Sequence, residues 1–461
     1  MPRESNATTK SPQAALLELY ARRAVPRYTS YPTAPHFAKN FSPDLYRQWL
    51  GALDAQKAIS LYVHIPFCKQ MCWYCGCNMK LAARYAPVRE YVDHLIAEID
   101  LVAAALPGPL PVSHLHFGGG TPTALSPEDL ARIVHHIETK FIFRADAERA
   151  IETDPRTITD EMIARIGELG FTRASLGVQE FDPRVQAAIN RVQPAALVAS
   201  TTEKLRKAGV RSINFDLIYG LPQQTEAALC STVHECMAMQ PDRIVLFGYA
   251  HVPWMAKNQR MIDEQALPGS QERANQARSS ARELIAGGYR AIGIDHFALP
   301  ADSLARAAEE GRLHRNFQGY TDDGAQTLIG FGATAIGRTP SGYVQNQPET
   351  GAWSRAIAGG QIPIAKGHAM QGEDRLRAHV IEKIMCEGAI DLDAAGSAFG
   401  LPSQWHEREE PILHKFEQDG LIRRKGGHLT LTDAGAALAR VVASTFDTYL
   451  ARHETRHSLA V

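Results

Sequence analysis

Four cysteines fall within a short segment near the start of the chain, with the spacing C-x3-C-x2-C-x-C: Cys68, Cys72, Cys75 and Cys77. Thiolates are soft ligands, so this spacing indicates a local metal or redox site. A structural zinc site usually joins two cysteine pairs about a dozen or more residues apart, and no such second pair is present. A compact loop of three thiolates suits an iron–sulfur cubane, in which one iron is left without a protein ligand. Zinc and reactive, metal-free thiols are the alternatives.

A glycine run, Gly118-Gly119-Gly120-Thr121-Pro122, is the second group with chemical potential. Glycines admit a ligand close to the backbone, because they carry no side chain. The alternative is a tight turn between a strand and a helix, where glycines are common. A dinucleotide site is disfavoured, because the run lacks the G-x-G-x-x-G spacing.

Six short apolar runs, each ending in polar or glycine residues, predict the strands that position these groups. They span Leu61–Phe67, Leu115–Phe117, Ala150–Glu152, Ala174–Val178, Ile213–Ile218 and Ile244–Tyr249. Helical patterns lie between most of them; in one, Ser126 and Asp129 form a capping box for a helix that ends at Lys140. Alternating strands and helices imply parallel pairing with right-handed crossovers. We therefore predict an α/β fold with an incomplete (β/α)6 barrel, whose carboxyl-terminal mouth holds the site.

The segments on either side of this pattern differ from it. Residues 1–58 contain a helical pattern, Ala14–Arg23, and an aromatic, proline-punctuated arm, Arg27–Thr33. Residues 59–350 hold the partial barrel and a polar segment that follows it, His314–Tyr320. Residues 351–461 read as a mostly helical domain with a terminal hairpin, Leu421–Leu431, typical of a winged helix. Acidic residues outnumber basic ones over 371–461, which disfavours DNA binding by this domain.

Composition excludes several classes of function. The 461 residues include 49 Lys plus Arg and 50 Asp plus Glu, so the net charge is close to zero. The protein therefore has no overall positive electrostatic field that would attract nucleic acid or anionic lipid. No stretch approaches the roughly 18 uninterrupted apolar residues of a membrane span, and the first residues lack the apolar core of a signal peptide. We expect a cytoplasmic protein with no nucleic-acid partner and no membrane span.

The motifs together resemble those of a known family. The cysteine loop after the first strand and the glycine run after the second are similar to the two defining motifs of radical S-adenosylmethionine (radical SAM) enzymes. Cys77 and the segments Ile151–Arg156, Gly177–Gln179, Asp216–Pro222 and His314–Thr321 further resemble the oxygen-independent coproporphyrinogen III oxidases. The resemblance covers nearly the whole chain, from the arm to Phe446–Leu450.

The resemblance implies both the cofactors and their ligands. Cys68, Cys72 and Cys75 match the three anchors of a [4Fe-4S] cluster, and the family binds two molecules of S-adenosylmethionine in each active site. The first molecule would contact Tyr62, Tyr74, Gly119, Glu152 and Ile336. The second would contact Gly120, Thr121, Gln179, Arg191, Asp216 and Ala250. Cys77 and Tyr62 are the candidate catalytic residues, and the role of Cys77 is left open.

The residue types suit these roles. Glu152 and Asp216 can accept hydrogen bonds from ribose hydroxyls or an amine, and Arg191 can hold a carboxylate with a two-point fork. Tyr62 can lie near a sulfonium and gain roughly 0.5–2 kcal/mol from cation–π attraction. The alternative is a structural ion pair in which Arg191 neutralises one of the two carboxylates, because an unpaired carboxylate in an apolar strand is costly.

The implied reaction converts two propionate side chains of coproporphyrinogen III to vinyl groups, giving protoporphyrinogen IX, through a 5′-deoxyadenosyl radical. A low-potential electron donor and an electron acceptor are required, and the sequence identifies neither; a monomer is expected. Arg27 and His314–Asn316 are candidates for holding the propionates. The alternative function is a haem-binding chaperone of the same superfamily, from which Cys77, the arm and His314–Tyr320 distinguish this chain.

Overall fold

The computed structural model describes residues 19–20, 23–402 and 404–450. They form two compact units: one runs from His36 to Met370, and the other joins the described residues up to Pro35 to those from Gln371 onward. The helix predicted over Ala14–Arg23 lies largely outside the described residues. No helix among the described residues is long and apolar enough to cross a membrane.

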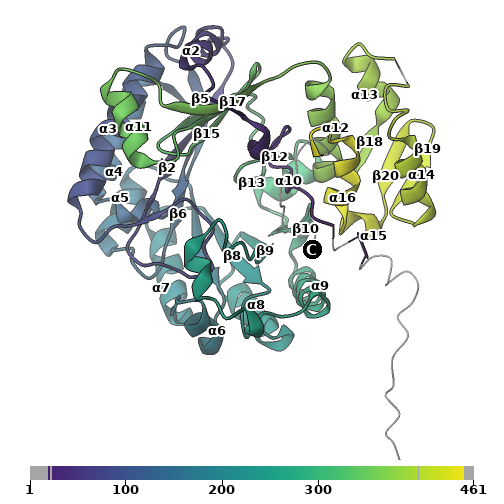
Figure 1. Ribbon diagram of the computed structural model, residues 1–461. Coiled ribbons are helices and arrows are strands. Elements are labelled where there is room, and N and C mark those ends of the chain that lie inside the picture. Colours follow the sequence, from purple (N-terminus) through teal and green to yellow (C-terminus); the bar gives the residue numbers. More distant parts are fainter. Residues whose placement is uncertain (1–18, 21–22, 403, 451–461) are drawn as a thin grey trace, which may run out of the picture. The chain divides into compact units, whose positions relative to one another are not determined.

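A 13-stranded sheet forms the centre of the larger unit (Figure 1). Six of its strands are neighbours and pair in parallel, in chain order. These six are β2 (Ile59–Ile65), β5 (Pro111–Gly119), β6 (Ile142–Thr153), β7 (Arg173–Gln179), β8 (Ser212–Tyr219) and β9 (Arg243–Gly248). They correspond to the six predicted runs, so the prediction of an incomplete (β/α)6 barrel is confirmed.

The sheet extends beyond the six strands on both sides, which the sequence did not predict. β14 pairs in parallel with β2 and is followed by antiparallel strands, while β11 and β10 continue antiparallel from β9. The added strands are β1 (Ala38–Lys39), β10 (Arg290–Ile292), β11 (His296–Ala298), β14 (Leu328–Phe331), β15 (Ile336–Thr339), β16 (Gly342–Asn346) and β17 (Ile364–Ala369). Two short pairs lie outside this sheet: β3 (Phe67–Cys68) with β4 (Lys80–Leu81), and β12 (His314–Asn316) with β13 (Gly319–Thr321).

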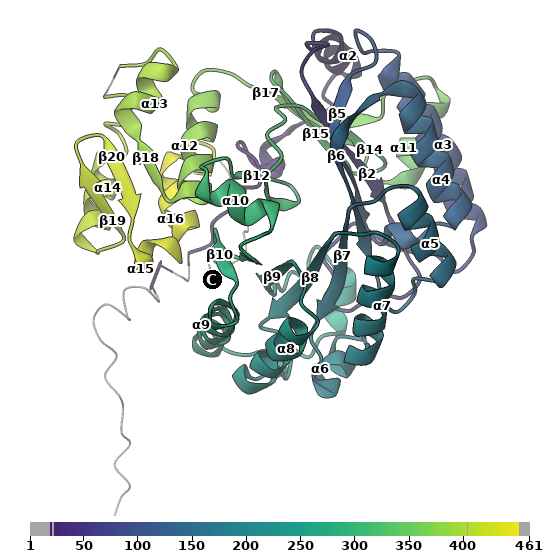
Figure 2. The same cartoon turned by 180° about the vertical axis from the view of Figure 1, so that it is seen from behind.

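Helices cover the outer side of the curved sheet (Figures 1 and 2). The longer helices of this unit are α2 (Pro43–Gly51), α3 (Ala86–Ala103), α4 (Pro127–Lys140), α5 (Asp160–Glu168), α6 (Pro183–Ala188), α7 (Ala195–Lys207), α8 (Glu226–Ala238), α9 (Ser270–Ala286), α10 (Ser303–Glu309) and α11 (Thr350–Ala358). Short 3₁₀ turns are η1 (Ala34–His36), η2 (Pro122–Ala124), η3 (Lys257–Met261) and η4 (Glu264–Ala266).

Side-chain caps and burial explain why these elements form where they do. The hydroxyl of Ser126 accepts the backbone N–H of Asp129 at the start of α4, and Thr159 and Thr225 cap α5 and α8 in the same way. Most of β7 alternates between buried and partly exposed residues, whereas β2 is buried on both faces, with six of its seven residues buried. A continuous apolar strand of this kind is typical of a parallel sheet covered by helices.

The smaller unit contains helices and a three-stranded antiparallel sheet in the order β18-β20-β19. Its elements are α12 (Asp374–Glu387), β18 (Ala389–Asp391), α13 (Leu392–Ala398), α14 (Glu410–Gln418), β19 (Ile422–Lys425), β20 (His428–Leu431), α15 (Asp433–Ala436), α16 (Ala439–Ala443) and η5 (Ser444–Phe446). The predicted hairpin is present as β19 and β20, with Gly426 in the left-handed region at the turn. The helices with a hairpin wing match the predicted winged-helix-like domain.

The aromatic arm belongs to the smaller unit. The hydroxyl of Tyr28 donates to Asp447 Oδ2 at 3.0 Å, and Tyr31 meets Tyr449 edge-on with ring centroids 5.8 Å apart. In contrast, Trp49 and Leu50 of α2 are buried in the core of the larger unit, and β17 joins its sheet. The predicted boundaries at residues 58 and 350 therefore differ from the observed division, because the arm and the chain end pack together while α2 and β17 complete the barrel unit.

Candidate functional site

The predicted site residues lie on or just after the carboxyl ends of neighbouring parallel strands. The cysteine loop follows β2, Gly119 ends β5, Glu152 is the next-to-last residue of β6 and Gln179 ends β7. Asp216 lies within β8, beside Gly177 of β7. Because parallel strands end at one edge of the sheet, these groups share the mouth of the partial barrel. Ile336 begins β15, which belongs to the antiparallel extension of the same sheet.

The cysteine loop places its four thiols in different surroundings. Cys68 and Cys72 are buried, Cys75 is half-buried and Cys77 is exposed. The Sγ atom of Cys68 lies 3.5 Å from the hydroxyl oxygen of Thr121, which links the loop to the glycine run. Hydrogen bonds from the thiol and the backbone N–H of Cys77 lower the pKa of Cys75 to about 7. Burial raises the pKa of Cys68 to about 11 in the absence of a metal.

Two residues that the sequence did not single out hold the backbone of this loop. The side-chain amide of Asn258 donates to the carbonyl oxygens of Cys72, Trp73 and Cys75 at 3.1, 3.2 and 2.8 Å. Gln259 donates to the carbonyl oxygen of Tyr74 at 2.7 Å and to that of Ala250 at 3.1 Å. Gln259 thus connects two predicted cofactor-binding residues. Both amides lie in η3, in a segment without periodicity, so only their polarity was visible in the sequence.

The glycine run packs against the strand that leads to the cysteines. The backbone N–H of Gly120 donates to the carbonyl oxygen of Ile65 at 2.9 Å. A Cβ atom at Gly120 would lie 2.8 Å from the carbonyl oxygen of Phe67, and one at Gly119 would lie 2.8 Å from the His64 ring. Gly119 also has a φ of 119°, a conformation that L side chains rarely adopt. Close backbone approach therefore requires both glycines, in addition to any role in ligand binding.

Glu152 and Tyr62 both lie against His116 at this edge of the sheet. The backbone N–H of Gly119 donates to Glu152 Oε2 at 3.1 Å, and His116 Nε2 lies 3.4 Å from Oε1. The Tyr62 ring stacks on the His116 ring with centroids 5.9 Å apart, and its hydroxyl lies 3.0 Å from His64 Nδ1. The side chain of Glu152 remains 40 % exposed, so the carboxylate is accessible to a ligand.

Asp216 and Gln179 form a second polar group beside the first. Asp216 accepts from the Ser175 hydroxyl at 2.9 Å and from the Asn214 amide at 2.8 Å. Burial raises the pKa of the Asp216 carboxyl. The buried Oε1 of Gln179 and Oδ1 of Asn214 have no hydrogen-bond partner among the described residues. Buried polar atoms are normally paired, so these two acceptors fit a ligand that brings its own donors.

Arg191 forms an ion pair, but its partner is neither Glu152 nor Asp216. The sequence-based alternative therefore named the wrong carboxylates. The Nη2 atom of Arg191 lies 3.2 Å from Asp154 Oδ1, and it also donates to the carbonyl oxygen of Gly177. Asp154 carries a second partner, Arg156, at 2.6 Å. The sequence offered no assignment for Asp154, because an aspartate just after a strand is also typical of a turn.

The candidate propionate ligand Arg315 is buried in the larger unit. Its side chain is 3 % exposed, lies 3.9 Å from Asp295 and stacks over the Tyr320 ring at 4.3 Å. A cationic role toward the substrate stays a prediction for this residue. Arg27 belongs to the smaller unit, and its role also stays a prediction.

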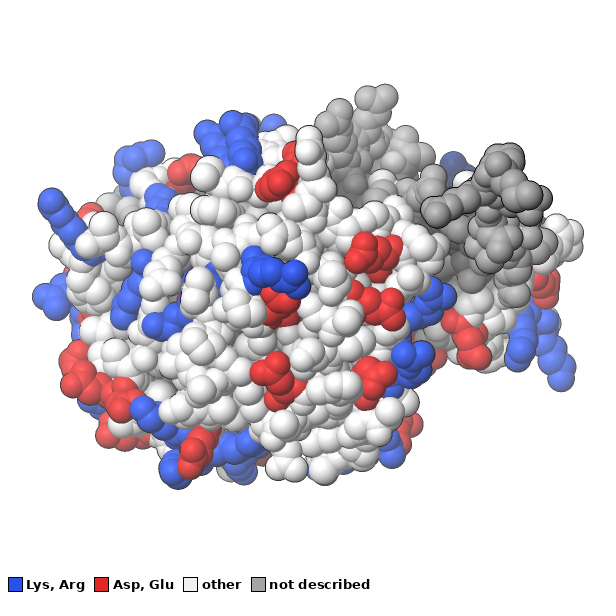
Figure 3. Space-filling model, turned by 90° about the horizontal axis from the view of Figure 1, so that it is seen from below, with Lys and Arg blue, Asp and Glu red and all other residues white. Residues whose placement is uncertain are grey.

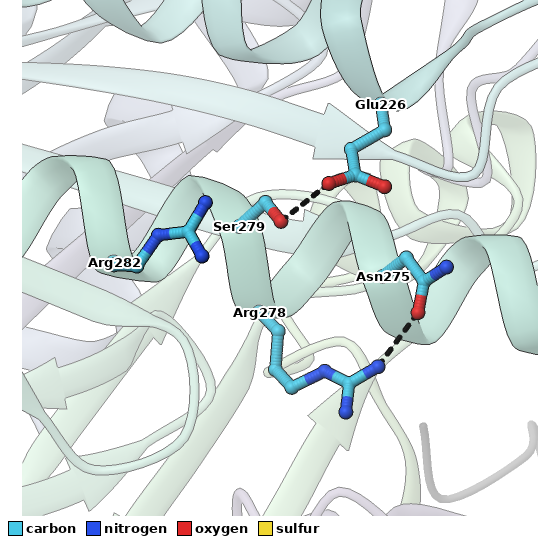
Figure 4. A pocket seen from close by; sticks show the side chains of 5 residues that line it. All are labelled: Glu226, Asn275, Arg278, Ser279 and Arg282. Carbon is cyan, nitrogen blue, oxygen red and sulfur yellow. Dashed lines mark hydrogen bonds between the residues drawn. The ribbon is translucent and has the colours of Figure 1, made fainter.

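A pocket of about 520 Å³ lies elsewhere, between α8 and α9 (Figure 4). It is lined by Glu226 from α8 and by Asn275, Arg278, Ser279 and Arg282 from α9. None of the predicted site residues lines it, and its polar groups already bond to one another, as between Ser279 and Glu226 at 2.6 Å. The surface charges shown in Figure 3 are mixed in sign, in keeping with the near-neutral composition.

The donor set fits an iron–sulfur cluster. Three thiols of one loop lie at the carboxyl end of β2, and no group of three His, Cys, Asp or Glu among the described residues converges on a single metal ion. A cubane binds each cysteine to a different iron, so its anchors need not converge in that way. The assignment of Cys68, Cys72 and Cys75 to the cluster stays a prediction.

Comparison with known proteins decides the family. The model of the radical SAM superfamily matches residues 62–236, and that of the HemN C-terminal domain matches residues 370–438. The chain is 45% identical over 449 residues to the oxygen-independent coproporphyrinogen III oxidase of Bradyrhizobium diazoefficiens, covering 97% of this chain and 100% of that protein. This chain belongs to the oxygen-independent coproporphyrinogen III oxidase family.

Further members of the coproporphyrinogen III oxidase family agree. The chain is 44% identical to "Coproporphyrinogen III oxidase, anaerobic 1" of Cereibacter sphaeroides, covering 95% of this chain and 96% of that protein. The solved structure of coproporphyrinogen III oxidase (HemN) from Escherichia coli, described as a radical SAM enzyme, matches with a TM-score of 0.88 at 35% identity, covering 93% of this chain and all of that chain. The HemN C-terminal match begins at residue 370, one residue before the smaller unit resumes. Membership implies an iron–sulfur cluster and S-adenosylmethionine.

Proposed function

We propose that this chain is an oxygen-independent coproporphyrinogen III oxidase, which oxidatively decarboxylates two propionate side chains of coproporphyrinogen III to give protoporphyrinogen IX. The single observation that carries the proposal is the 45% sequence identity with a member of this family over 97% of the chain. The cysteine loop at the mouth of a matching barrel supports it. When bound, the cluster and S-adenosylmethionine supply a carbon radical that removes one hydrogen atom from a propionate.

Cys68, Cys72 and Cys75 hold the cluster in this proposal. The exposed Cys77 is left out of the anchor set and acts near the substrate. Asn258 and Gln259 fix the loop backbone, so the three sulfur atoms are presented in one arrangement. Such support matters because a ligand held by neighbouring hydrogen bonds loses little freedom on binding the metal.

Two molecules of S-adenosylmethionine occupy the mouth of the barrel in this proposal. Tyr62, Tyr74, Gly119, Glu152 and Ile336 serve the first molecule. Gly120, Thr121, Gln179, Arg191, Asp216 and Ala250 serve the second molecule. The exposed Glu152 carboxylate and the unpartnered acceptors of Gln179 and Asn214 support two separate polar binding regions. Each carboxylate can accept hydroxyl or amine donors of its own ligand.

The overall reaction removes one hydrogen atom and one carboxyl group from each of two propionates. For each vinyl group formed, carbon dioxide leaves and one electron passes to an acceptor, while a low-potential donor supplies the electron that initiates the cleavage. The proposed enzyme acts as a monomer in the cytoplasm, with a low-potential electron donor and a separate electron acceptor. The barrel mouth must exclude oxygen and stray hydrogen-atom donors during the reaction, because both quench a carbon radical.

An anaerobic assay tests this function. Reconstituted full-length protein is incubated with coproporphyrinogen III, S-adenosylmethionine and a chemical reductant, and the porphyrins are separated after oxidation. We expect protoporphyrin, with one methionine and one 5′-deoxyadenosine formed for each vinyl group. Stoichiometric haem binding without any vinyl product would instead identify a chaperone of the superfamily.

A further inference from the structure

The sulfur atom of Cys72 receives two charged hydrogen bonds, one of which comes from a residue with no role in the proposed cofactor contacts. Arg156 Nη2 lies 3.2 Å from Cys72 Sγ, and Arg191 Nη1 lies 3.4 Å from it. The side chains of Arg156 and Arg191 are 5 % and 6 % exposed. Burying a charged guanidinium costs free energy that a solvent-exposed position would avoid. The fold therefore holds both arginines against the sulfur.

Asp154 fixes the orientation of Arg156. The carboxylate accepts from Arg156 Nε at 3.0 Å and from Nη2 at 2.6 Å, and it also accepts the Arg156 backbone N–H at 3.1 Å. The same carboxylate lies 3.2 Å from Arg191 Nη2. Although burial acts to raise the pKa of Asp154, the charges of Arg191 and Arg156 lower it overall, so the aspartate is ionised. Fork contacts of this kind leave the guanidinium little freedom to turn away from the sulfur.

The three side chains leave one excess positive charge beside the thiol. Two guanidinium groups and one carboxylate face Cys72 in a buried region, where charges interact more strongly than in water. Reduction of an iron–sulfur cluster adds a negative charge that spreads onto the ligand sulfurs. Hydrogen bonds to those sulfurs, and nearby charge, are among the factors that set the reduction potential.

We propose that Arg156, held by Asp154, is a positioning residue that raises the reduction potential of the cluster bound through Cys72. The inference rests on the proposed function, in which Cys72 is a cluster ligand. Arg156 eases entry of the electron, because its N–H group and its charge stabilise the reduced state more than the oxidised state. Asp154 has two effects: it aims the guanidinium, and its negative charge limits how far the potential is raised.

Substitutions at the two positions move the potential in opposite directions. Arg156→Gln removes a positive charge and a donor to sulfur, so the potential falls. Asp154→Asn removes a negative charge while the amide oxygen still accepts from Arg156, so the potential rises. Arg156→Lys keeps the positive charge but cannot donate to Asp154 and to the sulfur in the planar arrangement of a guanidinium. The reduction potential of its cluster should lie between those of Arg156→Gln and the unsubstituted protein. General loosening of the site would shift all variants in the same direction, so the opposite signs distinguish tuning from damage.

The measurement is an anaerobic redox titration of the reconstituted full chain, followed by electron paramagnetic resonance of the reduced cluster. For Arg156→Gln we expect the reduction equilibrium constant to fall about tenfold, which is about 59 mV for a one-electron couple. Arg243→Gln is the matched control: Arg243 is buried and pairs with Asp302 at 2.6 Å, but it begins β9, at the opposite end of the parallel strands. Its potential should match that of the unsubstituted protein.

Each outcome has a defined meaning. An unchanged potential in Arg156→Gln with full cluster content, or shifts of equal sign in Arg156→Gln and Asp154→Asn, would overturn the inference and leave the proposed function intact. Absence of any cluster signal in the unsubstituted protein would overturn the proposed function itself. If Arg156→Gln does not retain its cluster, the other two variants still test the inference. Arg156→Lys should lower the potential, and Asp154→Asn should raise it.

Discussion

Asn258 donates its side-chain amide to the carbonyl oxygen of Cys75 across 2.8 Å, although 183 residues separate the two in the sequence. The same amide also contacts the carbonyl oxygens of Cys72 and Trp73. The cysteine loop, which follows the first parallel strand, is therefore shaped by the segment that follows the sixth. We therefore predict that the ability of the cysteine loop to bind a cluster depends on the barrel being folded through β9.

Replacement of Asn258 by alanine tests this dependence. The variant leaves three carbonyl oxygens of the loop without this donor, and each net hydrogen bond is worth about 1 kcal/mol, so we expect a loss of about 1–3 kcal/mol in unfolding free energy. Iron and sulfide content after anaerobic reconstitution should fall in parallel. Asn275→Ala, in the polar pocket on α9, is the control and should retain full content. Full cluster content in Asn258→Ala would show that the loop holds its shape unaided.

The strand pattern and the residues with distinctive chemistry could be predicted from the sequence, whereas their supports could not. Runs such as Ile213–Ile218 identify a buried strand, because the alternation of apolar and polar residues and the length of the run can be read from neighbouring positions alone. Asn258 and Gln259 lie in an irregular segment, and only the folded chain reveals that their amides meet the cysteine loop. A single polar side chain carries no local sign of a partner so distant in sequence.

The same distinction explains where the structure differs from the sequence-based predictions. Arg191 lies within hydrogen-bond distance of Cys72. Its predicted ion-pair partner was a strand carboxylate, Glu152 or Asp216, whereas the observed partner is Asp154, just beyond β6. The domain boundaries at 58 and 350 followed changes in composition. The observed division follows packing, as in the contact of Tyr28 with Asp447 across 419 positions. Contacts of that separation are specified by tertiary structure rather than by local pattern.

Gly120→Ala should damage the cysteine site through the backbone. The new Cβ atom would lie 2.8 Å from the carbonyl oxygen of Phe67, the residue before Cys68, and a strand backbone cannot yield as a flexible side chain does. Overpacking of this kind costs about 1–3 kcal/mol, and we expect that loss in chemical denaturation together with reduced cluster content. Gly269→Ala is the control, because a Cβ there meets no atom within 4 Å. Equal stability of the two variants would contradict the close approach.

Asp216→Asn should remove one molecule of S-adenosylmethionine while sparing the cluster. The substitution keeps the size of the side chain but loses the charged acceptor, at a cost of about 1.5–3 kcal/mol in binding free energy. Anaerobic equilibrium dialysis should show two bound molecules in the unsubstituted protein and one in the variant at the same ligand concentration. Glu226→Gln in the α8–α9 pocket serves as the control. An unchanged stoichiometry and affinity would remove Asp216 from the second binding region.

The ion pair of His114 with Asp323 predicts a pH dependence of stability. His114 Nδ1 lies 3.2 Å from Asp323 Oδ1. Burial acts to lower the pKa of His114, but the Asp323 carboxylate outweighs it and raises the pKa above 6.5. The pair therefore stabilises the fold fully below the unfolded pKa of the histidine, and this contribution is lost as the pH rises through the raised pKa.

Urea denaturation at several pH values measures this contribution. Between about pH 6 and about pH 9 the unfolding free energy of the unsubstituted protein should fall more than that of His114→Gln, whose side chain does not titrate. The exposed His428→Gln should keep the pH dependence of the unsubstituted protein. Parallel curves for the unsubstituted protein and His114→Gln would show that the pair adds nothing to stability.

Mössbauer spectroscopy of protein reconstituted and handled without air tests the central claim most directly. Cys68, Cys72 and Cys75 as the only protein anchors predict a [4Fe-4S] spectrum in which one iron differs from the other three and changes when S-adenosylmethionine is added. The spectrum should be absent in Cys72→Ala and retained in Cys77→Ser. A cluster with four equivalent cysteine-bound irons that requires Cys77, or a spectrum unaltered by S-adenosylmethionine, would contradict the account.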